Sequence, residues 1–122
     1  MGTQILGDQG ANVIKVEGLT GAAERGSARQ KMTSPLFSVL NRNKKSLSVD
    51  LKTEGGVEVF KKLVANSDII IQNFRPGVAD RMGIGYEDMK AINNKIIYVS
   101  ISGFGAKGPY SQKVGYVSYP CP

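Results

Sequence analysis

The residues best suited to chemistry in this sequence are two arginines that flank a proline–glycine pair. Arg75 and Arg81 stand on either side of Pro76-Gly77, shortly after the apolar run Ile69–Ile71. A β-branched apolar run is typical of a strand buried on both faces of a parallel sheet, and Pro76 suits the first position of a helix that residues 78–82 can continue. Where such a strand gives way to a helix, outward backbone N–H groups can bind anions. The pattern predicts an anion site, and a surface turn with two solvated arginines explains it equally well.

A second group of basic residues lies earlier in the chain. Arg42, Lys44 and Lys45 fall in a span without acidic residues between Glu24 and Asp50, in a chain of net charge +6. This span predicts a positive potential that suits a phosphate-bearing ligand. Solvated lysines are the alternative, and for these residues alone the one to prefer. A nucleic acid partner is not expected, because the basic residues are neither interleaved with aromatic residues nor aligned along one helix.

The composition argues against several other kinds of site. The sequence has no histidine, so imidazole is excluded as a base or a metal ligand, and we expect no metal site. The single Cys121 excludes an internal disulfide and suits a reducing compartment. No apolar run approaches the ~20 residues of a membrane span, and the N-terminus lacks a signal peptide's basic and apolar regions. We therefore predict a cytoplasmic protein without a membrane partner.

Four segments have the composition of strands and alternate with helical segments. The predicted strands are Asn12–Glu17, Ser46–Leu51, Ile69–Ile71 and Ile96–Ser102. The predicted helical segments are Gln4–Gly10, 34–40, 53–66, 78–82 and Tyr86–Ile92. Such alternation favours a parallel sheet covered by helices on both sides. The length of 122 residues suits a single α/β domain over 1–122.

Local signals define some of these elements further. Thr53 is the predicted N-cap of its helix, followed by an apolar stripe at helical spacing, Val57, Phe60, Leu63 and Val64. In the helix Tyr86–Ile92, Met89 and Ile92 are expected to face inward. Gly18–Thr33 is predicted to be a long loop. Gly103–Tyr110 is glycine-rich, but without a clear following helix it is neither a dinucleotide fingerprint nor a P-loop.

Four blocks of the sequence, in order and spacing, resemble a known family. They are GANVIKVE, NRNKKSLSVDLKTEGG, SDIIIQNFRPGVADRMGIGYEDM and NNKIIYVSISGFGAKGPYS. They are similar to the N-terminal part of the family III CoA-transferases, also called the CaiB/BaiF type, and the resemblance covers nearly all of residues 5–116. That family includes formyl-CoA:oxalate CoA-transferase, the carnitine and bile-acid CoA-transferases and α-methylacyl-CoA racemase.

The resemblance implies a fold, a reaction and a set of binding residues. It implies a Rossmann-like, mostly parallel sheet flanked by helices, in a homodimer of interlocked chains. It implies that CoA moves between carboxylic acids through an aspartyl-CoA thioester, with acyl-CoA and carboxylic acids as partners and CoA as the carried substrate. The positions that match CoA-contacting or neighbouring positions in the family are Val49, Lys44, Lys45, Asn73, Phe74, Arg81, Met82 and, at a more variable position, Arg75.

The departures from the family pattern concern catalysis. The family's nucleophilic aspartate lies well beyond the GFG and GPY blocks, and the family pattern matches it to none of Asp8, Asp50, Asp68, Asp80 or Asp88. We therefore expect no catalytic residue in this chain, which resembles a truncated piece of the family fold. Three functions stay open: the CoA-binding part of a transferase, a free-standing non-catalytic CoA-binding or assembly module, and a fragment of an α-methylacyl-CoA racemase.

Overall fold

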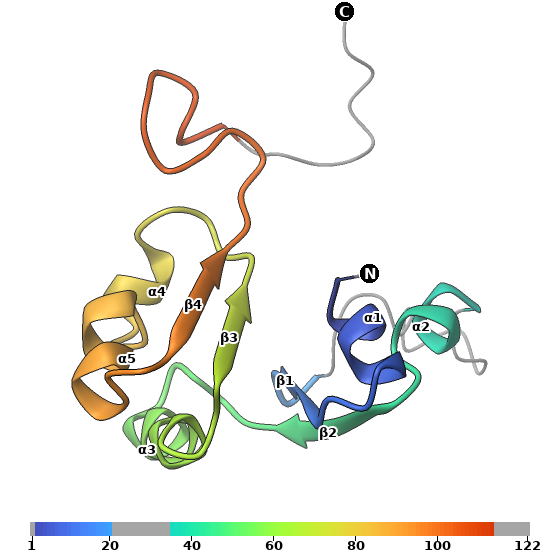
Figure 1. The fold of residues 1–122 in the computed structure, drawn as a ribbon. Coiled ribbons are helices and arrows are strands. Elements are labelled where there is room, and N and C mark those ends of the chain that lie inside the picture. The colour runs from blue at the N-terminus through green and yellow to red at the C-terminus, as the bar shows by residue number, and fades with distance from the viewer. Residues whose placement is uncertain (1, 21–34, 114–122) are drawn as a thin grey trace, which may run out of the picture. The chain divides into compact units, whose positions relative to one another are not determined.

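The computed structural model describes residues 2–20 and 35–113, which fall into two compact units (Figure 1). The first unit is Met1–Asp50 and the second is Leu51–Pro122. Both combine helices with parallel strands, so the predicted α/β class is confirmed. A single domain over all 122 residues stays a prediction.

The first unit contains helix α1 (Gly2–Asp8), strand β1 (Val13–Glu17), helix α2 (Pro35–Leu40) and strand β2 (Lys44–Ser48). Helix α1 is closed, as predicted, by Gly10, which follows its last turn. The φ of Gly10 is 95°, a value that glycine adopts without steric cost. The Ala11 N–H donates to Leu6 O at 3.0 Å and the Gly10 N–H to Gly7 O at 3.1 Å. These two bonds form a Schellman motif, which caps the last carbonyl groups of the helix.

The two strands of this unit pair in parallel over their whole length. Val13 lies opposite Lys44, and Glu17 lies opposite Ser48. The predicted bounds of the second strand, Ser46–Leu51, are therefore wrong by two to three residues. The pairing with β1 begins at Lys44, and the chain leaves the ladder after Ser48. Lys44 and Lys45 therefore lie inside the strand, outside its predicted bounds.

The second unit contains helix α3 (Glu54–Val64), strand β3 (Ile69–Gln72), the short helix α4 (Val78–Arg81), helix α5 (Tyr86–Ile92) and strand β4 (Ile97–Ser100). The predicted N-cap of α3 is confirmed, since the Thr53 hydroxyl accepts a hydrogen bond from the Gly56 N–H at 3.1 Å. Strands β3 and β4 lie side by side in parallel, with Ile69 opposite Ile97 (Figure 1).

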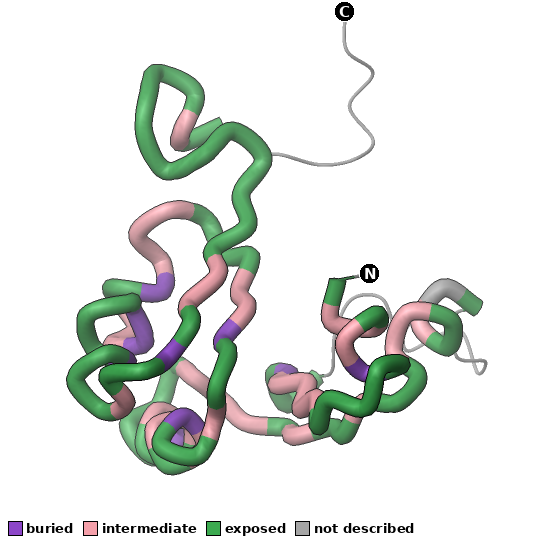
Figure 2. The backbone as a smooth tube through the Cα atoms, viewed as in Figure 1, coloured by how far each residue is buried: buried purple, intermediate pink, exposed green. Residues whose placement is uncertain are grey.

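The buried apolar side chains of the described residues form one core, and it lies in the second unit (Figure 2). It joins α3, β3, α4 and α5 with the segments before α5 and β4, through Val64, Ile70, Ala79, Ile84, Met89 and Ile96. Met89 is fully buried, as predicted, but Ile92 is 38% exposed, so its predicted inward position is wrong. The core fixes the end of α4 against the start of α3, because Met82 and Val57 both pack on it.

Only one face of the β3–β4 pair is covered by described residues of this unit. Ile70 is 9% exposed, whereas Ile69 and Ile97, on the opposite face, are 42% and 58% exposed. The expectation that β3 is buried on both faces is therefore wrong for the second unit taken by itself. Alternate residues of a strand point to opposite faces, and the three helices of this unit pack on the face that carries Ile70.

Candidate functional site

The corner between β3 and α4 is a type II turn. Its central residues are Pro76 and Gly77, and the Val78 N–H closes it by donating to Arg75 O at 3.0 Å. Gly77 has φ 79° and ψ −6°, the conformation that this turn requires of its third residue. The positive φ of Gly77 also explains why the predicted position of Pro76 is wrong. Pro76 is not the first residue of the helix, which starts at Val78, because a left-handed residue cannot belong to it.

Arg81 lies at the end of α4 and reaches back over this turn. Its Nη1 atom would be 3.3 Å from a Cβ atom placed on Gly77. The side chain is exposed, and within the described part of the chain neither Arg81 nor Arg75 forms an ion pair with a carboxylate. The structure thus places two exposed cationic groups near the carboxyl end of a parallel strand, and anion binding by them stays a prediction.

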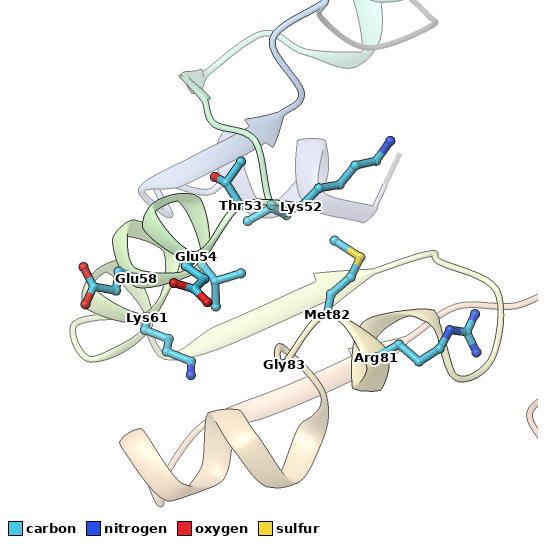
Figure 3. A pocket seen from close by; sticks show the side chains of 10 residues that line it. Lys52, Thr53, Glu54, Glu58, Lys61, Arg81, Met82 and Gly83 are labelled. Atoms are coloured by element: carbon cyan, nitrogen blue, oxygen red, sulfur yellow. The ribbon is translucent and has the colours of Figure 1, made fainter.

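Arg81 and Met82 also line a pocket of about 620 Å³ between α3 and the end of α4 (Figure 3). Its apolar side consists of Leu51, Val57 and Met82. Its charged residues are Lys52, Glu54, Glu58, Lys61 and Arg81, and Thr53 and Gly83 complete the lining. A cavity with one apolar wall and three basic side chains can take a flat ring system that carries phosphate groups.

The residues directly after β3 lie beside the turn but not in this pocket lining. Asn73, Phe74 and Arg75 are exposed, Phe74 by 37%. Gln72 fixes this stretch, since its Oε1 accepts from the Phe74 N–H at 2.7 Å and its Nε2 donates to Ser100 Oγ at 2.8 Å. The structure therefore brings Arg81 and Met82 together in a cavity and leaves the other three on the adjoining surface.

The remaining predicted residues belong to the first unit. Val49 follows β2 and donates its N–H to Glu17 O at 2.9 Å. Lys44 is partly buried, with its Nζ 3.4 Å from Asn41 Oδ1, and Lys45 is exposed on the same strand. All three residues lie in β2 or directly after it.

Arg42 has a different role from its two lysine neighbours. Its Nη2 and Nε atoms donate to the two carboxylate oxygens of Asp8 at 2.6 and 3.1 Å. Asn43 Nδ2 donates to the same carboxylate at 2.9 Å. The hydrogen bond from Arg42 lowers the pKa of Asp8, and the same contact raises the pKa of Arg42. The ion pair ties α1 to the turn before β2, so Arg42 adds less to the positive potential than its sequence position suggested.

Two basic residues of the pocket, Lys52 and Lys61, were not identified from the sequence. A signal for Lys52 was present, because it directly precedes the predicted N-cap Thr53 and therefore lies at the N-terminus of α3. Lys61 falls seven residues after Glu54 and therefore on the same face of the helix. What the sequence lacked was the packing of this face opposite Met82, which makes it the wall of a cavity.

The described residues contain neither a cluster of metal ligands nor a helix that could span a membrane. Residues 2–20 and 35–113 contain no group of three or more His, Cys, Asp or Glu side chains that could hold a metal ion. In the same ranges, no helix has both the length and the apolar character needed to cross a lipid bilayer.

Comparison with known proteins identifies the family. The family model of CoA-transferase family III matches residues 1–118. This chain belongs to CoA-transferase family III. It is 42% identical over 116 residues to the formyl-CoA:oxalate CoA-transferase of Streptomyces avermitilis, covering 93% of the chain and 28% of that protein. It is 44% identical over 118 residues to the human succinyl-CoA:glutarate CoA-transferase, covering 93% and 27%.

A solved structure of this CoA-transferase family has the same fold. The crystal structure of a CaiB/BaiF family protein from Brucella suis matches with a TM-score of 0.85 at 42% identity, over 93% of this chain and 32% of that one. The resemblance inferred from the sequence is thus confirmed. The chain spans a little over a quarter of the length of the curated CoA-transferases that it matches.

Proposed function

We propose that this chain is the part of a family III CoA-transferase that holds the nucleotide end of CoA. The observation that carries the proposal is the pocket whose lining includes Arg81, Lys52 and the apolar residue Met82. Family membership supplies the ligand class, since the relatives named above transfer CoA. The pocket supports a location within the chain for its phosphate-bearing end.

The chemistry of the lining fits this part of CoA better than its acyl end. The phosphates of CoA are anionic, and a guanidinium presents a fork of donors to such a group. Adenine is a flat, largely apolar ring system, which can pack on a polarizable thioether such as that of Met82. Met82 is itself held against the buried core of the second unit, so this wall is formed before a ligand arrives.

The reaction we propose for the whole transferase is the one that the family resemblance implies. A carboxylate attacks the thioester carbonyl of an acyl-CoA, the CoA thiolate leaves, and an anhydride forms. The thiolate then attacks the anhydride on the enzyme side, which yields an aspartyl-CoA thioester and releases the donor acid. The acceptor acid repeats these steps in the opposite sense. We propose that the reacting aspartate belongs to polypeptide beyond this sequence, and that residues here bind and orient CoA.

Calorimetric titration of CoA into the purified chain tests the binding proposal. Arg81→Ala should weaken binding about tenfold or more, the usual range for losing a charged hydrogen bond. Arg75→Ala is a matched control, because it removes an exposed arginine from the same turn that does not line the pocket. It should change the affinity less than about twofold. Equal losses in both variants, or no binding by the native chain, would contradict the proposal.

A non-catalytic CoA-binding or assembly module is the second candidate. The observation that favours it is that the family pattern matches none of the five aspartates from Asp8 to Asp88 to its nucleophile. Both candidates predict that this chain binds CoA without turnover, so turnover separates the two of them from a complete transferase. We expect no thioester exchange between an acyl-CoA and a carboxylic acid by the purified chain, and measurable exchange would refute that. Loss of the α-hydrogen of a 2-methylacyl-CoA would indicate a racemase instead.

The proposed setting of this activity is cytoplasmic, with acyl-CoA and carboxylic acids as partners in a homodimer. These proposals rest on the family resemblance. Light scattering of the purified chain tests the oligomer. A mass of one chain at micromolar concentration would argue against a dimer formed by this part alone.

A further inference from the structure

The pocket of the second unit carries charges of both signs, which a site built for phosphate alone would not need. Glu54, Glu58, Lys61 and Arg81 line it, and within residues 2–20 and 35–113 none of these four forms an ion pair. The basic lining residues Lys52, Lys61 and Arg81 suit the phosphates of CoA, but a carboxylate next to them repels these phosphates. A carboxylate in this place stabilises a ligand only if it accepts a hydrogen bond from a donor on that ligand.

The two carboxylates differ in position. In Figure 3 the Glu58 carboxylate lies on the side of α3 that is farther from Met82, and the Glu54 carboxylate lies nearer to Met82. Glu54 is therefore better placed to meet a ring that packs on the thioether. Among the donors at the nucleotide end of CoA, the 6-amino group of adenine lies on the edge of that ring. Carboxylates recognise exocyclic amines of bases in this way, through a hydrogen bond accepted from the amine.

We propose that Glu54 is a specificity-determining residue that accepts a hydrogen bond from the 6-amino group of the adenine of CoA. This inference rests on the proposed function, since it assumes that the pocket takes the nucleotide end. The cations then bind phosphate, Met82 packs on the ring face, and Glu54 selects the ring edge. A site whose polar group needs a donor discriminates strongly against analogues that lack it. The chain therefore prefers CoA to 1,N6-etheno-CoA, in which a two-carbon bridge removes the amine donor.

The test compares CoA with etheno-CoA in equilibrium titrations of the whole 122-residue chain. The native chain should bind CoA about tenfold more tightly than etheno-CoA, near the lower end of what a charged hydrogen bond contributes at an exposed site. Glu54→Ala should bring this ratio close to one. Glu54→Gln should keep most of it, because the amide oxygen still accepts from the amine. Glu58→Gln and Glu58→Ala are the matched controls and should leave the ratio unchanged.

Each other outcome has a definite meaning. If the native ratio is near one, or if Glu54→Ala leaves a native ratio intact, Glu54 does not select the amine. If Glu54→Ala weakens both ligands equally, the carboxylate binds a ribose hydroxyl, and the assignment is wrong. If Glu54→Ala and Glu54→Gln both tighten CoA binding, Glu54 acts only by repelling phosphate. In all three cases CoA still binds, whereas absence of CoA binding by the native chain would defeat the proposed function itself.

Discussion

The two compact units of this chain differ in how they are held together. The second unit has a core whose buried apolar side chains come from α3, α4, α5, β3 and the segments between them. In the described residues of the first unit, the buried positions are Gly7 and Glu17, and none is a large apolar side chain. The first unit is therefore held by its strand pairing, its helix cap and polar contacts such as Asp8 with Arg42. The candidate pocket lies in the unit that has a core of its own.

Within the second unit, the two faces of the β3–β4 pair differ in the same way, because one face packs on a core and the other is exposed. Ile70 and its neighbours in the core are shielded by three helices, while Ile69 and Ile97 are half exposed on the other face. The exposed face is the more apolar of the two, since it carries Ile69, Ile71, Ile97 and Val99, whereas the covered face carries Ile70, Gln72, Tyr98 and Ser100. Burial here thus depends on which face the helices cover, and substitutions on opposite faces should have different costs.

The largest effect expected from this contrast is that of Met89→Ala. Met89 is fully buried, and truncation of such a side chain removes its transfer energy and leaves a cavity, at a cost of about 2–5 kcal/mol. Ile97→Ala is the control on the open face, where 58% of the side chain is already exposed. It should cost less than about 1 kcal/mol. Urea unfolding measures both, and equal losses would show that the open face is covered in solution.

The next largest effect is expected at Gly85, which joins α4 to α5. A Cβ atom there would overlap the Asp80 carboxylate and lie 3.1 Å from Asp80 Cα, although the φ of −68° suits any residue. Gly85→Ala should therefore destabilise the unit by about 1–3 kcal/mol, the usual cost of overpacking. Gly55→Ala is the matched control inside α3, with nothing within 4 Å of its added Cβ. It should raise stability by about 0.5–1 kcal/mol, so the two variants should shift the unfolding midpoint in opposite directions.

A smaller effect is expected at Tyr98, whose hydroxyl donates to Ile84 O at 2.9 Å beneath α5. Burial raises the pKa of this phenol, and the nearby carboxylates of Asp80 and Asp88 raise it further, so it stays protonated at neutral pH. Tyr98→Phe should cost about 1 kcal/mol through the lost hydrogen bond. Tyr86→Phe removes a hydroxyl from the neighbouring, more exposed ring and should cost only a few tenths of a kcal/mol. The hydroxyl's role would be disproved by equal thermal midpoints for the two variants.

The sequence predicted those features of the fold that depend on neighbouring residues. Thr53 caps α3, Gly10 closes α1 and Met89 is buried in α5, because each follows from a local pattern that tertiary structure did not override. Where the prediction failed, a distant partner decided the outcome. Lys44 joins a strand because β1 pairs with it, and Ile92 is exposed because no described helix covers it.

The candidate site could be predicted only in part for the same reason. Arg81 and Met82 were predicted from the family resemblance, and both line the pocket. Lys52 and Lys61 were missed because their membership in the pocket depends on how α3 packs opposite the end of α4. The glycine at position 77 was recognised as a turn residue, but its positive φ, which excludes Pro76 from the helix, became visible only in the structure.

The smallest effect we predict is the pH dependence of the first unit, which has polar contacts in place of a core. The hydrogen bond from Arg42 lowers the pKa of Asp8 below its usual value of 3.8 in the folded chain. A group with a lowered folded pKa contributes stability above its unfolded pKa and loses that contribution as the pH falls through the folded value. Unfolding free energies measured between about pH 5 and pH 2 should therefore fall less steeply in Asp8→Asn than in the native chain. A slope that Asp8→Asn does not alter would show that this exposed pair is too well solvated to support α1.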